Sequence, residues 1–201
     1  MIPSYDWPTL VTKYGFPSES PCLPDYAQRP CGFQESECQI LLCLIDALAT
    51  KPTRILEFGT YEGSLASLLL RHVPSVRHYV GIDRPCGGSG ESRDYDIDGK
   101  SRGFYAQQDA RFSLLLCGGG TGSLDADILP RHMHVCIIDG DHRRPGVEHD
   151  TELARCSVAT GGILVWHDYD RHHDGVWDFL NQHRSDGYNI ESAGALAWEF
   201  L

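Results

Sequence analysis

The segment from Arg54 to Ser64 constrains the fold of this chain more than any other part of the sequence. An apolar run ends in Glu57, Gly59 and Gly63 follow four residues apart, and leucines at helical spacing begin directly afterwards. Glycine is favoured where a turn needs a positive φ or where a ligand approaches the backbone. The pattern therefore predicts a strand, a tight turn and a helix, which is how a nucleotide-binding βαβ unit opens.

The spacing within this turn indicates which kind of ligand it accepts. The motif is E-x-G-x-x-x-G, with one glycine fewer than the G-x-G-x-x-G turn of dinucleotide-binding proteins and an acid at the strand end. An acid there disfavours a pyrophosphate, so we expect a ligand that carries positive charge or hydroxyl groups. The alternative is an ordinary strand–helix turn without a ligand.

Strands and helices alternate along the rest of the chain. Strands are expected over residues 53–58, 77–83, 103–107, 133–139 and 162–167, with two final strands within 188–201. Helices are expected over 34–49, 62–72, 145–157 and 173–184, and another directly after Asp109. This alternation predicts an α/β fold: a doubly wound, mainly parallel, Rossmann-like sheet of seven strands with helices on both faces.

The proline- and tyrosine-rich residues 1–33 are expected to form an N-terminal arm that packs on or covers the site, with residues 34–201 as one domain. Two glycine-rich stretches, 85–90 and 118–122, do not lead into helices as a phosphate loop would. We expect both to be flexible loops near the ligand.

Composition and charge exclude several classes of protein. The formal net charge is −11, whereas nucleic-acid-binding proteins usually present a basic face, so no nucleic-acid partner is expected. No signal peptide is visible, and the best apolar run, Ile40–Ile45, is too short to cross a bilayer. We therefore expect a cytoplasmic protein without a membrane partner. The eight cysteines form no C-x-x-C pair and are expected to be reduced, with Cys43, Cys117, Cys136 and Cys156 in apolar surroundings.

Ligands of a doubly wound sheet bind outside the carboxyl ends of its strands. The candidate residues at these ends are Glu57, Gly59, Asp83, Asp109, Asp139, Asp141, His142, His167, Asp168 and Tyr169. Asp83 lies 20 residues beyond Gly63, a spacing that suits an acid accepting hydrogen bonds from both ribose hydroxyls. The alternative for Asp83 is a turn aspartate before Arg84. Because an acid follows every strand expected before residue 170, this edge fits a ligand with positive charge and ribose hydroxyls.

The glycine turn and the acids after the second and third strands resemble class I S-adenosylmethionine-dependent methyltransferases. Two further segments resemble a small-molecule O-methyltransferase group that includes macrolide-sugar methyltransferases and cephalosporin-hydroxylase-like proteins. They are Ile138-Asp139-Gly140-Asp141-His142 and the run from Gly161 to Tyr169. The resemblance covers about residues 50–170 and implies S-adenosyl-L-methionine as cofactor, with residues 34–201 as the methyltransferase domain.

The resemblance also implies roles for single residues. Glu57, Gly59 and Gly63 would surround the methionine part of the cofactor. Asp83 would hold the ribose, Asp109 with Ala110 would lie at the adenine, and Asp139 would lie beneath the sulfonium. The full set of implied cofactor contacts is Glu57, Gly59, Thr60, Tyr61, Gly63, Ser64, Asp83, Arg84, Asp109, Ala110 and Asp139.

In related catechol-type and macrolide-sugar enzymes, a strand-4 acid and two adjacent strand-5 residues bind a divalent cation. The matching positions here are Asp139, His167 and Asp168, but the relatives have Asp-Asn or Glu-Asp where this chain has His-Asp. Magnesium prefers oxygen ligands, whereas imidazole suits transition metals. A cation is therefore optional in this prediction, and its identity stays open among magnesium, manganese, zinc and iron. A second departure is the stretch 84–102, which shows no convincing helix.

Two mechanisms fit the candidate catalytic residues Asp139, His142 and His167. In the first, a cation on Asp139 and Asp168, with or without His167, lowers the pKa of an acceptor hydroxyl. In the second, His142 or His167 removes the hydroxyl proton as a general base. The structural alternatives are that His167 caps its strand and that His142 begins a helix. Four other residues are expected in solvated positions: His149, Asp150, His172 and His173.

The function expected from these observations is O-methylation of a hydroxyl on a small molecule such as a sugar, phenol or natural product. The alternatives are a metal-dependent oxygenase or hydroxylase on the same scaffold, and a non-catalytic protein that binds the cofactor and a partner. The expected partner is the small-molecule acceptor, and a homo-oligomer stays open.

Overall fold

The computed structural model describes residues 1–26, 32–48, 53–85 and 101–201, and these residues build a seven-stranded sheet. The strand order is β3-β2-β1-β4-β5-β7-β6. The strands are β1 (Thr53–Phe58), β2 (Val76–Asp83), β3 (Phe112–Leu116), β4 (Met133–Ile138), β5 (Val158–Trp166), β6 (Glu191–Ala193) and β7 (Leu196–Phe200). Strands β1 to β5 pair in parallel, and β7 is antiparallel to β5 and β6. The predicted fold class is confirmed.

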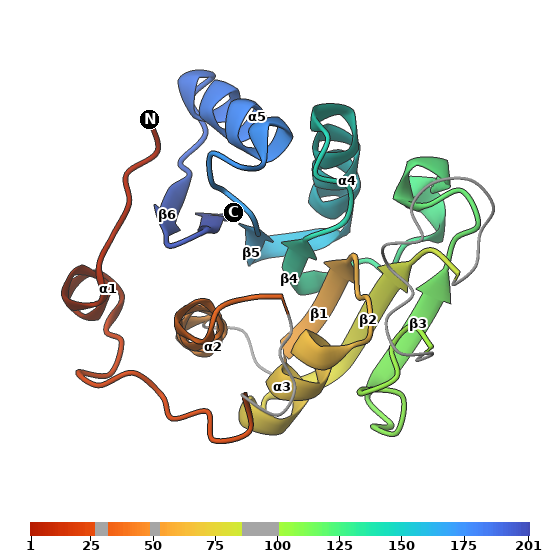
Figure 1. Cartoon of the computed structure of the whole chain (residues 1–201), viewed down its shortest axis with the longest axis horizontal. Coiled ribbons are helices and arrows are strands. Elements are labelled where there is room, and N and C mark those ends of the chain that lie inside the picture. Colours follow the sequence, from red (N-terminus) through yellow and green to blue (C-terminus); the bar gives the residue numbers. More distant parts are fainter. Residues whose placement is uncertain (27–31, 49–52, 86–100) are drawn as a thin grey trace.

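Helices cover both faces of the sheet (Figure 1). Those described are α1 (Trp7–Tyr14), α2 (Glu35–Ala47), α3 (Ser64–His72), α4 (Arg144–Ser157) and α5 (Asp174–Ser185), with short 3₁₀ turns η3 (Thr121–Ser123) and η4 (Ala126–Ile128). Successive strand residues point to opposite faces. Ile55 of β1 accordingly packs in a core with α2 and α3, whereas Leu56 packs with α4 and α5.

The sheet has its topological switch point between β1 and β4. The chain runs outward from β1 to β2 and β3, then returns to place β4 on the other side of β1. Phe58 and Ile138 are partners at the ends of these strands, and the Asp139 N–H donates to the Phe58 carbonyl at 2.9 Å. The residues that follow β1 and β4 therefore lie next to each other, where ligands bind in such sheets.

The third strand is the main correction to the sequence prediction. It lies at Phe112–Leu116 and not at 103–107, and no helix follows Asp109. The segment 101–109 forms turns that hydrogen-bond to the glycine turn: the N–H of Gly103 donates to the Tyr61 carbonyl, and that of Tyr105 to the Glu62 carbonyl. Aromatic residues give this segment a strand-like composition, but tertiary hydrogen bonds decide its structure. Most of the stretch 84–102, with the first glycine-rich stretch, lies outside the described residues.

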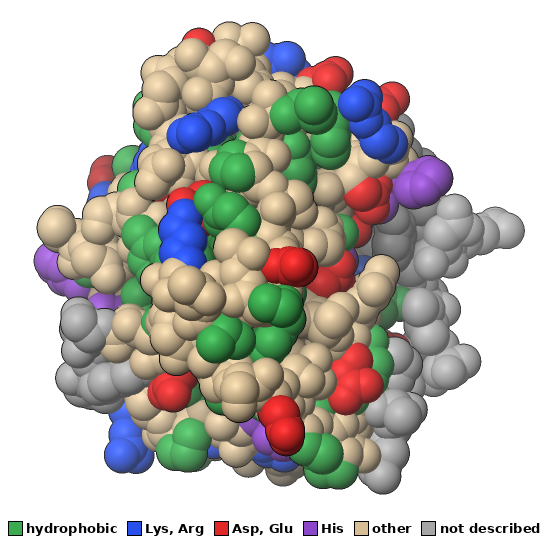
Figure 2. Space-filling view, turned by 90° about the vertical axis from the view of Figure 1, so that its left-hand side faces the viewer, with side chains coloured by type: hydrophobic (Ala, Val, Ile, Leu, Met, Phe, Trp, Pro, Cys, Tyr) green, Lys and Arg blue, Asp and Glu red, His purple; other side chains and the backbone are tan. Residues whose placement is uncertain are grey.

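The N-terminal arm contains a helix that the sequence analysis missed. The Asp6 side chain accepts a hydrogen bond from the Thr9 N–H, which caps α1. Leu10 of α1 is buried in the core formed with α2 and α3, and Tyr14 hydrogen-bonds Glu191 of β6. Figure 2 shows the face that carries α1, where hydrophobic, basic and acidic side chains are interspersed and no single kind forms a patch.

Two other expectations concern membrane-spanning helices and the state of the cysteines. Within the described ranges, no helix is long and apolar enough to cross a membrane. The cysteines described there are free thiols, and Cys156 is exposed, which corrects its expected apolar environment.

Candidate active site

The glycine turn between β1 and α3 is tightly constrained by its neighbours. Gly59 has φ 87°, and a Cβ there would lie 2.0 Å from the Asp139 carbonyl oxygen. Gly63 has φ 77°, and a Cβ there would lie 2.9 Å from the Gly103 Cα. Both positions combine the left-handed conformation with a close backbone approach, which only glycine accommodates. Thr60 and Ser64 are buried within the same turn.

Glu57 ends β1 as a buried acid, with 2% of its surface exposed. Burial and then the nearby charge of Asp139 raise the pKa of Glu57 to about 8, against the opposing effect of the Tyr79 and Thr60 hydroxyls. Its Oε2 atom has no hydrogen-bond partner among the described residues. An unsatisfied buried oxygen is costly, so this carboxyl fits a cationic or hydrogen-donating ligand such as the one the resemblance implies.

Asp83 ends β2 and holds the glycine turn from the other side. Its Oδ2 accepts from the Tyr61 N–H at 2.5 Å, and its Oδ1 accepts from the Arg84 N–H at 2.6 Å. Arg102 lies 3.6 Å from the same Oδ1. A carboxylate offers about four acceptor positions, so Asp83 retains capacity for ribose hydroxyls beside these contacts.

Asp109 and Ala110 lie at the opposite edge of the sheet from the glycine turn. They precede β3, and Asp109 pairs with Arg111, whose guanidinium donates to the Val76 carbonyl at the amino end of β2. The sequence analysis placed Asp109 and Ala110 after the third strand, beside the adenine, whereas β3 begins after them. The carboxyl end of β3 instead leads into Cys117 and the glycine-rich stretch 118–122, and the Cys117 N–H donates to the Asp83 carbonyl at 2.9 Å. That stretch therefore lies beside Asp83 at the carboxyl edge of the sheet.

Four predicted residues after β4 and β5 converge into one cluster. His142 Nε2 lies 2.7 Å from Asp168 Oδ2 and 3.4 Å from Asp139 Oδ1. His167 Nδ1 lies 3.2 Å from Asp139 Oδ1 and 3.4 Å from Asp168 Oδ1. The two histidines therefore share the same pair of carboxylates, directly beside the glycine turn.

Mutual proximity shifts the pKa values of this cluster. The carboxylates of Asp139 and Asp168 close to its ring raise the pKa of His142 to about 10, although burial opposes the shift. Burial alone would lower the pKa of His167, but its carboxylate neighbours outweigh burial and raise it to about 12. Burial works to raise the pKa of Asp168, but His142 and His167 hold it below its usual range. These shifts favour the protonated form of both rings at neutral pH.

The group of side chains that the geometry brings within reach of one cation differs in one residue from the predicted set of Asp139, His167 and Asp168. Oxygen and nitrogen atoms of Asp139, His142 and Asp168 all lie within 4.8 Å of one another, which is close enough to share a cation. Asp168, Asp170 and His173 form a second such group. His167 has a carboxylate at each ring nitrogen, because its Nε2 also lies 3.3 Å from Glu37 Oε2.

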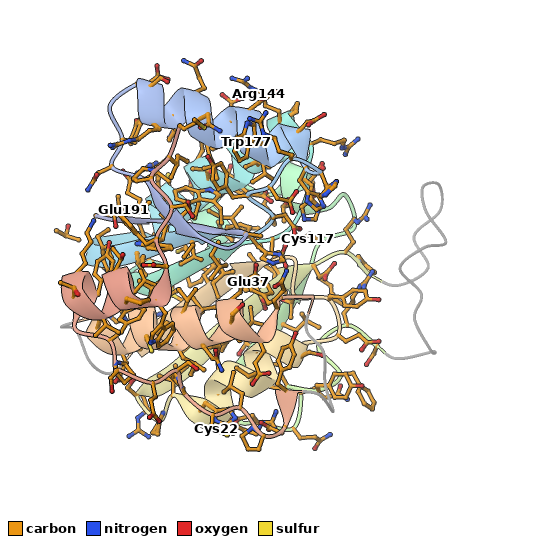
Figure 3. The ribbon with its side chains drawn as sticks, turned by 60° about the vertical axis from the view of Figure 1, so that its left-hand side comes forward. Cys22, Glu37, Cys117, Arg144, Trp177 and Glu191 are labelled. Atoms are coloured by element: carbon orange, nitrogen blue, oxygen red, sulfur yellow. The ribbon has the colours of Figure 1, made fainter. Side chains whose placement is uncertain are left out.

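Three residues near this cluster were missed by the sequence analysis. Glu37 reaches it from the first turn of α2 (Figure 3), and the Phe33 ring stacks on His167 with 3.8 Å between centroids. Asp150 was expected on a solvated face but is fully buried, with an oxygen 2.8 Å from where a Cβ of Gly140 would be. The capping pattern of Gln34 and Glu37 was a usable signal for the helix start, but no local signal reveals the contact with His167.

The fold and this strand-end site define a Rossmann-like methyltransferase domain. A family model described as a methyltransferase domain matches residues 56–169, more than half of the chain. The chain belongs to this family of methyltransferase domains.

Solved structures show the same fold at low sequence identity. The O-methyltransferase NovP has 15% identity and a TM-score of 0.64, with 96% of each chain covered. The O-methyltransferase TomG from Streptomyces achromogenes, involved in tomaymycin synthesis and solved with its cofactor, has 14% identity and a TM-score of 0.59, with 92% of each chain covered. CalS11, a TDP-rhamnose 3′-O-methyltransferase of calicheamicin biosynthesis, has 17% identity and a TM-score of 0.54, with 96% of this chain and 90% of that chain covered.

A curated relative is an uncharacterized protein of Acanthamoeba polyphaga mimivirus, 29% identical over 122 residues. The match includes 56% of this chain, and the chain spans about half the length of that relative.

Proposed function

We propose that this chain transfers a methyl group from S-adenosylmethionine to a hydroxyl group of a small molecule. The observation that carries the proposal is the convergence of Asp139, His142 and Asp168 beside the glycine turn. These side chains supply atoms that can bind a hydroxyl or accept its proton at the edge where the cofactor would lie. NovP, TomG and CalS11 support the proposal, since each is described as an O-methyltransferase and shares this fold.

The proposal includes a divalent cation, because the donor set fits one. Asp139, His142 and Asp168 would hold it, and when bound it would lower the pKa of the acceptor hydroxyl and orient the oxygen. The imidazole ligand favours manganese, zinc or iron over magnesium. As a base acting alone, His142 is less suited, because its pKa of about 10 leaves Nε2 protonated at neutral pH.

A hydroxylase fits the cluster less well. Non-haem iron oxygenases use two histidines and one carboxylate with open positions. Each candidate group in the described part of this chain has one histidine and two carboxylates. Elemental analysis of the purified protein tests this alternative, since bound iron with no methyl transfer would favour it over the proposal.

Cofactor binding is tested by thermal unfolding with and without S-adenosylmethionine. At a concentration about 100-fold above Kd, binding stabilises by about 2.7 kcal/mol, or about 5–10 °C for a domain of this size. We expect Asp83→Ala to abolish this shift. An unchanged melting temperature at millimolar cofactor would contradict the proposal.

Methyl transfer is tested with cofactor labelled in its methyl group and two hydroxyl probes, catechol and TDP-rhamnose. Label should appear on one of the two probes. Transfer of the label should stop when the protein is treated with EDTA and resume when manganese or zinc is added. Full activity in EDTA would remove the cation from the mechanism and leave His142 as the candidate base. No label on either probe, in a protein that binds the cofactor, would contradict transfer to these two classes of hydroxyl.

A further inference from the structure

Glu37 is a buried acid that the proposed chemistry does not use. It lies in the first turn of α2 with 2% of its surface exposed. Its Oε2 accepts from the Gln34 N–H at 2.8 Å, and its Oε1 accepts from the Ala195 N–H in the β6–β7 turn at 2.9 Å. Glu37 is therefore a buried carboxylate tied to three separate segments.

Helix capping does not explain the charge of Glu37. The capping-box position is filled by glutamate or glutamine, and it needs only an acceptor for the backbone N–H. A buried carboxylate is costly unless a cation compensates it. Among the contacts of Glu37, the side chain that can carry a positive charge is His167, whose Nε2 lies 3.3 Å from Oε2.

The ring of His167 is restrained on its face and on both nitrogens. Phe33 stacks on the ring with an interplanar angle of 15°. Nε2 points to Glu37, and Nδ1 points to Asp139 and Asp168. A rotation of the ring would break contacts on both sides at once. The ring therefore transmits the position of α2 to the two carboxylates that contact His142.

We propose that Glu37 is a positioning residue for methyl transfer: it fixes His167, and through His167 it orients Asp139 and Asp168 toward the reacting hydroxyl. This inference rests on the proposed function of the same cluster. It gives α2, which precedes the methyltransferase core, a role in the reaction although it supplies no group that touches the substrate. Residues that orient groups in a metal or acceptor site typically change activity about 10–100-fold when mutated.

The test compares Glu37→Gln with Glu35→Gln. Glu35 also lies in the first turn of α2, but it is exposed, so its variant removes the same charge from the same helix end. Glu37→Gln retains an amide oxygen for one of the two backbone donors and keeps the side-chain volume. Both proteins are labelled with ¹⁵N-histidine, and the ring N–H protons of His167 and His142 are observed by NMR.

In E37Q we expect exchange of the His167 Nε2 proton with water to speed up at least about tenfold, as expected for loss of a hydrogen bond to a charged group. The ring signals of His142 should also shift, although Glu37 does not contact His142, because Asp139 and Asp168 link the two rings. In E35Q both sets of signals should remain as in the wild type. Unchanged His142 signals in E37Q, or equal changes in E35Q, would overturn the proposal.

A second variant, Phe33→Leu, keeps Glu37 and removes the stacked ring, so the test remains decisive if E37Q does not fold. It should broaden or shift the His167 and His142 signals together, and signals like those of the wild type would count against the proposal. With whichever of catechol and TDP-rhamnose the wild type methylates as acceptor, kcat of E37Q should fall about 10–100-fold while the cofactor KM stays within about twofold. If the wild type does not bind S-adenosylmethionine, the proposed function fails, while the NMR comparison still decides whether Glu37 positions the cluster.

Discussion

Replacement of Gly59 by alanine tests whether β1 and β4 must approach each other closely to build the site. An added Cβ would lie 2.0 Å from the Asp139 carbonyl oxygen. That oxygen would have to withdraw by about 1.4 Å to restore an ordinary contact near 3.4 Å. Alanine would also have to adopt φ 87°.

The cost of this substitution follows from two separable effects. The left-handed conformation costs an L-residue about 1–2 kcal/mol, and overpacking typically costs about 1–3 kcal/mol. We expect Gly59→Ala to lower the free energy of unfolding by about 2–5 kcal/mol, a large part of the stability of a typical domain. Because Asp139 must move, affinity for S-adenosylmethionine should fall as well.

Gly161 provides the matched control. It has φ 79°, but nothing lies within 4 Å of an added Cβ, so Gly161→Ala carries the conformational cost without the clash. Urea unfolding of both variants and the wild type, with cofactor binding measured by calorimetry, separates the two effects. If Gly59→Ala is no more destabilising than Gly161→Ala, the close approach of Gly59 to the Asp139 carbonyl does not add to the loss of stability, and the reasoning is refuted.

Three further predictions address charge, the adenine side and the cation. The pKa of Glu57 rises from 4.5 to about 8 on folding, so the protonated side chain stabilises the fold fully below pH 4.5, and this contribution is lost as pH rises toward 8. Glu57→Gln should therefore gain stability relative to the wild type between pH 5 and pH 8. A difference in the free energy of urea unfolding that stays constant over this pH range would refute the assignment. Asp109→Asn should weaken the half-buried pair with Arg111 yet leave the cofactor Kd within about twofold, because Asp109 precedes β3 and lies at the opposite edge of the sheet from the glycine turn. A tenfold weaker Kd by calorimetry would return Asp109 to the cofactor site. Asp168→Ala should abolish manganese or zinc binding measured by calorimetry, because the shared carboxylate is removed from both candidate groups, and unchanged binding would place the metal elsewhere.

Local patterns were sufficient where the structure depends on local rules. The strand, turn and helix around Glu57 and Gly63 follow from an apolar run and a glycine spacing within one segment. The convergence of Asp139, His142 and Asp168 follows from one topological rule, that parallel strands bring their carboxyl ends to the same edge. These parts of the fold and site were predictable because few competing interactions bear on them.

The errors arise where distant segments decide the outcome. The turns at 101–109 are held by hydrogen bonds to the glycine turn, some forty residues earlier. Local composition alone therefore predicted the third strand at 103–107 and placed Asp109 after it, at the wrong end of the strand. By sequence pattern Asp150 lies on the polar face of α4, yet the structure buries it against Gly140. Gly140 has no side chain, and this leaves room for the Asp150 carboxyl. The pairing of Glu37 with His167 joins residues 130 positions apart, and no local periodicity encodes such a contact.

The charges of the cluster around His142 and His167 would favour a cationic ligand. Three carboxylates, those of Glu37, Asp139 and Asp168, surround two histidines, which leaves one negative charge unbalanced while Glu57 is protonated. Glu37 matters to this balance because it occupies one side of the His167 cation, so that Asp139 and Asp168 are less neutralised than they would be beside a solvated imidazolium. A sulfonium or a divalent cation would offset the remaining charge, and in a partly buried site such an interaction is screened less than in water. The same balance disfavours a pyrophosphate, in agreement with the acid that replaces a glycine at the end of β1.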